Sequence, residues 1–289
     1  MVLVGADVAC ASERYGDLSC QRITLPGGDS VLVALHGAHV LSWIVGGVEQ
    51  FYLSPRAVLD GRTAIRGGVP LCFPQFNQRG PLPRHGFARN MPWDLQSVEV
   101  RGDAAHITLA LAANSATRAI WPQSFIAAFN IDLTPGVLRL TLSVNNTDSI
   151  PLVFSGALHT YLAVSDIART QLMGLEGQAQ WDALNDVHGV AAPVLTFDGE
   201  FDRVYAAAPH ALTLRCGPRV LTLEQSETWS HTVVWNPGAE RCAQLSDLPP
   251  DGYAQMLCVE AAQVTEPVTV GAGEVWQGWQ RLVSTIETC

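Results

Sequence analysis

The stretch VLRLTLSVN, residues 137–145, decides the fold class of this chain. Every second residue in it is Leu or Val, and the residues between them are Arg, Thr and Ser. A period of two residues is typical of a β-strand with one face in the core and the other in water. The turn triplet TPG, residues 134–136, precedes this strand. The sequence therefore predicts an antiparallel hairpin with the strand at 125–133.

Similar short strands separated by turns continue in both directions along the chain. We predict them at 22–25, 30–37, 39–45, 49–53, 93–100, 105–112, 151–164, 220–237, 255–264 and 266–286. Short helices are expected only at 168–172 and 241–248, and no linker or repeat divides the sequence. Many short strands with frequent turns favour an all-β fold, a large antiparallel β-sandwich with few short helices. We expect residues 1–289 to form a single β-sandwich domain.

Composition limits the classes of function. The formal net charge is -10 and only 15% of residues are charged, which does not favour a nucleic-acid partner. No apolar run reaches the roughly 20 residues of a membrane span, and the N-terminal stretch lacks the pattern of a signal peptide. The seven cysteines contain no CxxC pair. We therefore expect a cytoplasmic protein with free thiols, among which Cys72 and Cys258 serve as packing residues.

The segment RGGVPLCFPQFNQRGPLPRHGFARN, residues 66–90, has a composition that packing alone does not explain. Four arginines and a histidine alternate with prolines, glycines and phenylalanines. The prolines exclude a continuous helix or a central strand. A long ordered loop costs backbone entropy, so such loops usually serve a site. Arginines gathered on an acidic chain indicate a small anionic ligand such as phosphate.

Ionisable residues also occur in strands where the pattern expects apolar ones. His159 follows an apolar run, Glu260 interrupts LCVEAA, and Asp202 lies in FDRVY. Buried carboxyl and imidazole groups can act as a general base and a general acid, although a structural pair is the simpler explanation for each residue alone. His36 and His39 form an HxxH motif, which we interpret as strand-end histidines rather than half of a metal site.

Taken together, the histidines and carboxylates can perform acid–base chemistry, and the arginines can bind a phosphate. Tryptophans such as Trp235 pack well on sugar rings. A phosphorylated sugar is the expected partner. Two other functions remain open at this point. A glycoside hydrolase would use Asp202 and Glu260 as its carboxyl pair. A non-catalytic carbohydrate-binding module would keep the sandwich without turnover.

The runs AIRGGVPLCFPQF, PLPRHGFARN, SGALHTYL, FDRVY, VVWNP and CVEA occur in this order. Together they closely resemble the motifs of the glucose-6-phosphate 1-epimerases, a branch of the aldose 1-epimerase (galactose mutarotase-like) superfamily. The resemblance implies a large single-domain β-sandwich of the galactose mutarotase-like supersandwich type. It also implies an isomerase that interconverts the α and β anomers of an aldohexose 6-phosphate, such as D-glucose 6-phosphate, without a cofactor. We expect a monomer and no metal.

The resemblance further implies residue roles. His159 would be the general acid that protonates the ring oxygen, and Glu260 the general base that takes the proton of the C1 hydroxyl. His85 would form a hydrogen bond near the reacting centre, and Asp202 would hold sugar hydroxyls. The phosphate would be bound by three arginines with a glutamine nearby: Arg66, Arg84, Arg89 and Gln75. The exposed loop position of Arg79 gives it no assigned role.

Overall fold

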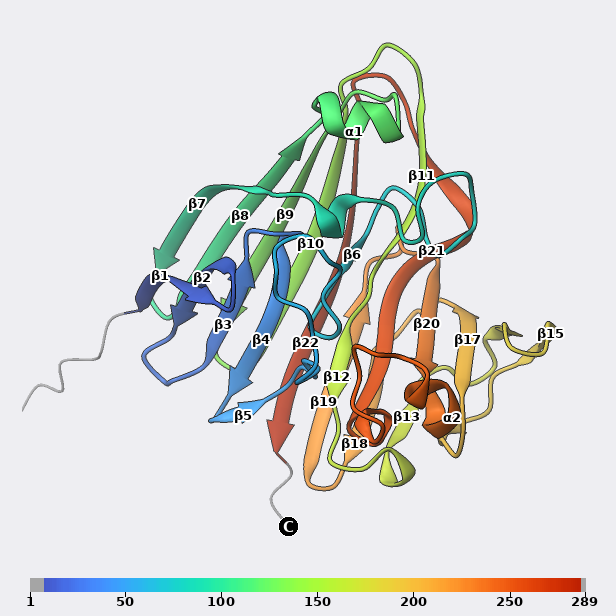
Figure 1. Cartoon of the computed structure of the whole chain (residues 1–289). Helices are drawn as coiled ribbons and strands as arrows, with labels where there is room; N and C mark the ends of the chain where they lie inside the picture. Colours follow the sequence, from blue (N-terminus) through green and yellow to red (C-terminus); the bar gives the residue numbers. More distant parts are fainter. Residues whose placement is uncertain (1–7, 287–289) are drawn as a thin grey trace, which may run out of the picture.

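The computed structural model describes residues 8–286, which form three antiparallel β-sheets (Figure 1). The nine-stranded sheet has the order β16 (Val194–Leu195), β13 (Gln171–Met173), β18 (Leu212–Cys216), β19 (Arg219–Gln225), β22 (Val275–Ile286), β10 (Val137–Asn146), β9 (Phe125–Thr134), β8 (Ala104–Ala112), β7 (Asp94–Arg101). The predicted hairpin is confirmed as β9 and β10, with Leu138 opposite Leu133. The predicted all-β class and antiparallel sheets are confirmed.

The second large sheet carries the residues of most interest. Its order is β15 (Val187–Val190), β14 (Ala179–Asp182), β17 (Phe201–Ala206), β20 (His231–Asn236), β21 (Met256–Val270), β11 (Leu152–Leu158), β6 (Leu71–Cys72), and β12 (Tyr161–Ala163) also pairs with β21. A third, five-stranded sheet runs in sequence order through β1 (Ala9–Tyr15), β2 (Leu18–Thr24), β3 (Ser30–Ala34), β4 (His39–Val45) and β5 (Val48–Glu49).

The main core lies between the two large sheets. Alternate residues of β10 are fully buried, and the residues between them are only partly buried. This confirms the period-two pattern of the sequence. Phe154 of β11 packs edge-on against Trp276 of β22, with ring centroids 5.0 Å apart, so aromatic side chains from both sheets meet in this layer.

The first nine residues of strand β21, 256–264, are buried on both faces of the strand. Leu257, Val259 and Ala261 belong to the main core. Cys258 and Ala262, on the opposite face of the strand, belong to two smaller clusters. A strand with two buried faces reads as a continuous apolar run, which explains the sequence around Glu260.

Strand β21 also corrects one predicted boundary. We predicted one strand at 255–264 and further strand structure at 266–286. In the structure, the first strand, β21, continues through Pro267 to Val270. Its register against β11 shifts between Phe154 and Gly156, which pair with Val268 and Gln263. Pro267 lies within this irregular stretch, where the loss of a backbone donor is tolerated.

The predicted strand at 151–164 would contain His159. In the structure, however, His159 lies outside any strand. The structure divides this element into β11 and β12, with His159 and Thr160 between them. The Thr160 amide donates to the Leu158 carbonyl at 2.9 Å, and the His159 amide donates to the Pro70 carbonyl at 3.1 Å. The chain therefore turns locally at His159, and its side chain departs from strand geometry.

The helical predictions were largely wrong. Residues 168–172 contain the end of a 3₁₀ turn, η2 (Ile167–Arg169), followed by β13, because Asp166 caps only a single turn. The helix predicted at 241–248 is α2 (Gly238–Ala243), which begins earlier and ends sooner. Helix α1 (Ser115–Ile120) was not predicted, although Asn114 and Thr117 cap its N-terminus reciprocally. Two further 3₁₀ turns are η1 (Ala88–Asn90) and η3 (Gly252–Gln255).

The arginine-rich segment 66–90 is a shaped loop, as predicted, and contains only β6 and η1 as regular structure. Aromatic side chains hold it to the core. Phe73 is fully buried and packs edge-on against Phe125 and Phe154, with ring centroids 5.5 and 5.2 Å apart. The Phe87 amide donates to the Phe73 carbonyl at 3.0 Å. A Cβ on Gly86 would collide with the same carbonyl, and this position has φ +70°.

Replacing Phe73 with alanine should lower the free energy of unfolding by about 3 to 5 kcal/mol, because it removes a buried ring from a close-packed cluster. Val190→Ala is the control, since Val190 is 66% exposed, and should change it by less than about 0.5 kcal/mol. Urea unfolding of both variants measures the difference. A loss below about 1 kcal/mol in Phe73→Ala would show that the loop is not anchored through this ring.

Candidate active site

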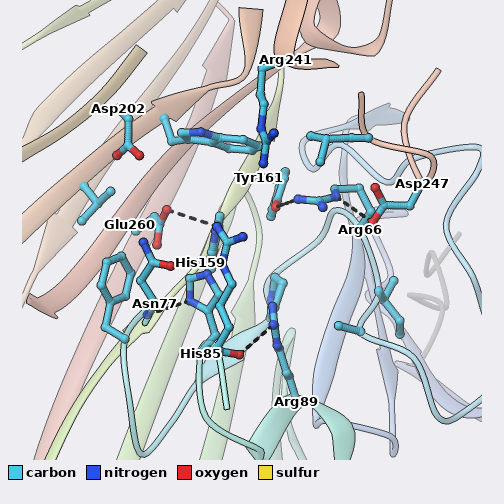
Figure 2. A pocket seen from close by; sticks show the side chains of 18 of the residues that line it. Arg66, Asn77, His85, Arg89, His159, Tyr161, Asp202, Arg241, Asp247 and Glu260 are labelled. Atoms are coloured by element: carbon cyan, nitrogen blue, oxygen red, sulfur yellow. Dashed lines mark hydrogen bonds and ion pairs between the residues drawn. The ribbon is translucent and has the colours of Figure 1, made fainter. Parts of the chain in front are cut away.

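A cavity of about 550 Å³ opens on the face of β21 that points away from the main core (Figure 2). Loop 66–90, the strands β17, β20 and β21, and the segment around α2 contribute its walls. All predicted site residues except Gln75 line it: Arg66, Arg84, His85, Arg89, His159, Asp202 and Glu260. The structure therefore brings together residues that are far apart in the sequence.

Strand pairing explains how the sheet supplies its part of the site. Val233 of β20 lies opposite Glu260 of β21, and Asp202 of β17 lies opposite Trp235 of β20. Directly opposed residues of neighbouring strands share a face of the sheet. The two carboxyl groups and the Trp235 indole therefore all line the cavity.

His159 and Glu260 are in contact at the base of the cavity. The Nδ1 atom of His159 lies 3.3 Å from Oε1 of Glu260, and the side chains are 11% and 1% exposed. Within residues 8–286, neither His159 Nδ1 nor Glu260 Oε2 has a hydrogen-bond partner. The Tyr161 ring stacks on the His159 ring at 4.8 Å, with an interplanar angle of 8°. The imidazole is therefore fixed in orientation while its acid–base atoms remain available.

Burial shifts both groups toward their neutral forms. It lowers the pKa of His159 well below its usual value, and the neighbouring His85, Arg89 and Arg66 lower it further. Burial raises the pKa of Glu260 well above its usual value, and the nearby Asp202 raises it too. Both shifts favour a neutral imidazole and a neutral carboxyl group in the free protein.

His85 faces His159, with ring centroids 5.5 Å apart. Its Nδ1 accepts a hydrogen bond from the Asn77 amide at 3.3 Å and lies 3.0 Å from the Cys72 thiol. Burial, with contributions from the cavity arginines, lowers the pKa of His85 to about 2. The ring is therefore neutral with its proton on Nε2, which makes it a hydrogen-bond donor rather than a base.

Arg66 is held by two partners that the sequence did not reveal. Its Nε donates to Oδ2 of Asp247 at 3.0 Å, and its Nη1 donates to the Tyr161 hydroxyl at 3.0 Å. Tyr161 follows His159 by two residues in HTYL, so the motif offered a signal for it. Asp247 lies in an irregular segment after α2 and had no such signal.

Three cavity arginines form no ion pair with a carboxylate in the part of the chain that the structure describes. They are Arg84, Arg89 and Arg241. The Nε of Arg89 is buried without a hydrogen-bond partner, and its Nη2 donates to the Arg84 carbonyl at 3.1 Å. Arg241 of α2 was not predicted as a site residue. Arginines that lack an acidic partner, among them the partly buried Arg89, favour an anion in the cavity.

Gln75 is the predicted site residue that the structure does not bring into the cavity. Its side-chain amide donates to the carbonyls of Asn77 and Leu82 at 3.0 and 2.9 Å, and its oxygen accepts from the Leu82 amide at 2.9 Å. The side chain therefore shapes the loop from within. Arg79 also lies outside the cavity lining and stacks over Trp181, with Cζ 4.4 Å from the ring centroid.

The opposite side of the cavity is acidic. Burial raises the pKa of Asp202 to about 6, and Glu200 raises it as well while Arg84 opposes the shift. Glu200 and Glu240 also line the cavity. In Figure 2, Asp202 and Glu260 lie on the left and the Arg66–Asp247 pair on the right, with His159 between them. The Arg66 guanidinium thus lies across the cavity from Asp202 and Glu260.

His39 supports the site from beneath. It begins β4, is fully buried, and its Nε2 lies 2.7 Å from the Gly67 carbonyl, next to Arg66. A carbonyl oxygen only accepts, so Nε2 carries the proton. Its place at the first residue of β4 agrees with the prediction of a strand-end histidine. Burial lowers the pKa of His39 to about 4.

This shift predicts a pH dependence of stability. The unfolded chain protonates His39 below about pH 6.5, whereas the folded protein does so only below about pH 4. The free energy of unfolding should therefore fall by about 1.4 kcal/mol per pH unit between these values as the pH decreases. Urea unfolding at pH 7 and pH 5 should show a loss about 2 kcal/mol smaller in His39→Gln than in the parent.

The exposed His210 provides the control for this measurement, because His210→Gln should keep the parent's pH dependence. Equal losses in the parent and His39→Gln would contradict the assignment of a neutral, buried His39.

Comparison with known proteins identifies the family of this chain. The family profile described as aldose 1-epimerase matches residues 20–283. A protein of Cenchrus ciliaris named "Putative glucose-6-phosphate 1-epimerase" is 35% identical over 258 residues, which cover 85% of this chain and 78% of the relative. A protein of the same name from Escherichia coli is 35% identical over 243 residues, covering 81% and 79%. The crystal structure of the "putative mutarotase (YeaD)" of Salmonella typhimurium superposes with a TM-score of 0.86 at 28% identity, covering 97% of each chain.

The chain belongs to the aldose 1-epimerase family. It is an isomerase with the galactose mutarotase-like β-fold, as the resemblance of its motifs implied. Family membership favours this class over the glycoside hydrolase and the non-catalytic module that the sequence left open. No helix within residues 8–286 is long and apolar enough to cross a membrane.

Proposed function

We propose that this chain interconverts the α and β anomers of a hexose 6-phosphate, with D-glucose 6-phosphate as the substrate. The observation that carries the proposal is the position of the His159–Glu260 contact in the same cavity as arginines without acidic partners. The first feature suits ring opening by acid and base, and the second suits a phosphate. The names of the relatives agree with this substrate.

The proposed reaction begins with Glu260 as a carboxylate and His159 protonated. Glu260 takes the proton of the C1 hydroxyl, the bond between C1 and the ring oxygen breaks, and His159 gives its proton to that oxygen. This yields the open-chain aldehyde, neutral His159 and protonated Glu260. Rotation about the C1–C2 bond presents the other face of the aldehyde. Closure then runs the same proton transfers in reverse and forms the other anomer.

The proton content of the pair fits this cycle. The neutral pair of the free protein and the charged reacting pair contain the same single proton, so they interconvert by moving it across the 3.3 Å contact. Arg66 and Arg89 contribute to the low pKa of His159. A phosphate dianion beside them offsets their positive charge and so favours the charged pair. In this proposal, the phosphate contributes to activation as well as to binding.

The remaining residues position the sugar. His85 donates a hydrogen bond from Nε2 near the reacting centre, Asp202 accepts hydrogen bonds from ring hydroxyls, and the Trp235 indole packs against the ring. Arg66, Arg84 and Arg89 bind the phosphate. Binding energy from a group remote from C1 orients the reacting bond without taking part in the chemistry.

We further propose that residues 1–289 act as one domain, as a monomer and in the cytoplasm. The six described cysteines are all free thiols, which suits a reducing compartment. The core that β21 shares with the nine-stranded sheet supports a single folding unit.

Removal of either acid–base group should reduce catalysed anomerisation by about 10² to 10⁴-fold. Glu260→Gln and His159→Asn are the test variants, because both substitutions keep the approximate shape of the side chain. NMR exchange between the C1 signals of the glucose 6-phosphate anomers measures the rate with catalytic amounts of protein. The exposed residues Glu227 and His210 supply matched controls, Glu227→Gln and His210→Asn, which should equal the parent. A folded test variant with parental exchange would remove that residue from the mechanism.

Arg89→Gln should raise the KM for glucose 6-phosphate by about 10 to 100-fold, because a charge-assisted hydrogen bond contributes about 1.5 to 3 kcal/mol. The kcat/KM for unphosphorylated glucose should change by less than about threefold. Arg101→Gln, at an exposed arginine outside the cavity, should leave both substrates unaffected. An equal loss for glucose and glucose 6-phosphate would exclude Arg89 from phosphate binding.

A further inference from the structure

A third side chain with a donor atom lies next to the two acid–base residues, although it does not itself line the cavity. Cys258, His159 and Glu260 each offer one ligand atom, and these atoms all lie within 4.8 Å of one another. All three side chains belong to buried residues. A role as a packing residue, which we predicted from the sequence, explains why Cys258 is buried. It does not explain why its sulfur lies so near the donor atoms of His159 and Glu260.

The fold holds the three groups on one side of β21. Cys258 and Glu260 are two residues apart on this strand, so both side chains leave the same face. His159, in the break between β11 and β12, reaches the same place, as Figure 2 shows for His159 and Glu260. Strands β12 and β20 flank β21 here and pair with it, with Tyr161 and Trp235 both opposite Cys258.

The polar atoms of this cluster are not satisfied by the protein. His159 Nδ1 and Glu260 Oε2 are buried without hydrogen-bond partners in the described chain. A buried polar atom without a partner costs about 1 to 3 kcal/mol. A cation coordinated by these atoms would replace the missing partners.

The donor set selects the kind of cation. One imidazole nitrogen, one thiolate sulfur and one carboxylate oxygen are the three ligand types of protein zinc sites, and an open fourth position is usual where the site faces a cavity. Sulfur disfavours magnesium and calcium, which prefer oxygen ligands alone. A thiolate and a carboxylate together also balance a charge of +2, which matters in a buried site.

Two features oppose the cation. Burial raises the pKa of the Cys258 thiol well above its usual value, so the metal has to displace a proton from sulfur, as at other zinc–thiolate sites. Arg84 and Arg89 add positive charge to the cavity, which Asp202, Glu200 and Glu240 on its acidic side offset. Both features weaken the site without removing a ligand.

We propose that Zn²⁺ binds between His159, Cys258 and Glu260 and inhibits the protein by taking both acid–base groups as ligands. The anomerisation itself uses no metal. The inhibition rests on the proposed function, whereas the binding of the metal does not. Zinc bound here would leave neither the imidazole nor the carboxylate free to exchange a proton with a sugar.

Binding is tested on the metal-free full-length protein with Co²⁺ as a spectroscopic substitute for Zn²⁺. The expected result is a sulfur-to-cobalt charge-transfer band in the near ultraviolet, together with the strong visible bands of four-coordinate cobalt, which Zn²⁺ abolishes by displacement. Cys258→Ser should lose the charge-transfer band. Cys20→Ser, at a buried thiol of another sheet, and Cys10→Ser, at an exposed thiol, should keep it. Persistence of the band in Cys258→Ser, or its absence from the parent, would overturn the site.

Inhibition is tested by anomer exchange at increasing Zn²⁺. The parent should lose activity and regain it with a chelator, and Cys258→Ser should need at least tenfold more zinc while keeping parental activity without metal. Equal inhibition of both proteins would overturn the proposal. If the parent shows the cobalt band but no anomerisation, the proposed function fails and the metal site stands.

A measurement on the Cys10→Ser protein, which keeps all three proposed ligands, covers the case in which Cys258→Ser does not fold. X-ray absorption at the zinc edge should show one sulfur at about 2.3 Å and nitrogen or oxygen ligands at about 2.0 to 2.2 Å. A coordination shell of the Cys10→Ser protein without sulfur would refute the site.

Discussion

The burial of β21 on both faces is the constraint on which the site depends. One face belongs to the core shared with the nine-stranded sheet, and the other lies beneath the cavity. A carboxyl group on such a strand has no bulk water to stabilise its charge, so its protonation is set by the few groups around it. For Glu260 these are His159 in contact and Asp202 nearby, and burial dominates. The same strand that stabilises the fold therefore also determines the acid–base state of the site.

The imidazole reaches Glu260 only because the chain breaks its strand geometry at His159. The break is supported from the loop side, where the Pro70 carbonyl accepts the His159 amide. The loop in turn is held by Phe73 and Phe87, whose rings lie in the core. Anchoring residues and site residues thus alternate along loop 66–90. Burial of its aromatic side chains offsets the backbone entropy that is lost when the loop is ordered. The arginines and His85 therefore face the cavity in fixed positions.

The sequence predicted those features that a local pattern carries. The alternation at 137–145 gave the strand class, and the proline- and arginine-rich composition of 66–90 indicated an ordered loop. The histidine and the carboxylate of the site stood out against apolar neighbours. Features that depend on contacts between distant segments could not be predicted in this way. Asp247 lies 181 residues from its partner Arg66. Gln75 has the chemistry of a ligand, yet its amide closes on its own loop. The short strands between residues 171 and 216 have no clear period, since each spans two to six residues.

The separation of charge across the cavity connects binding with chemistry in the proposed reaction. Asp202 and Glu260 lie across the cavity from the Arg66–Asp247 pair (Figure 2), so a ligand with an anionic end and a hydroxylated end has one favourable orientation. That orientation places the phosphate beside the residues whose charge keeps His159 neutral, and the sugar beside Glu260 and Asp202. A phosphate and a metal cation differ in how they interact with the positive charge near His159. A phosphate dianion offsets this charge, whereas a metal cation is repelled by it. The thiolate of Cys258 and the carboxylate of Glu260 would together supply a cation with compensating negative charge.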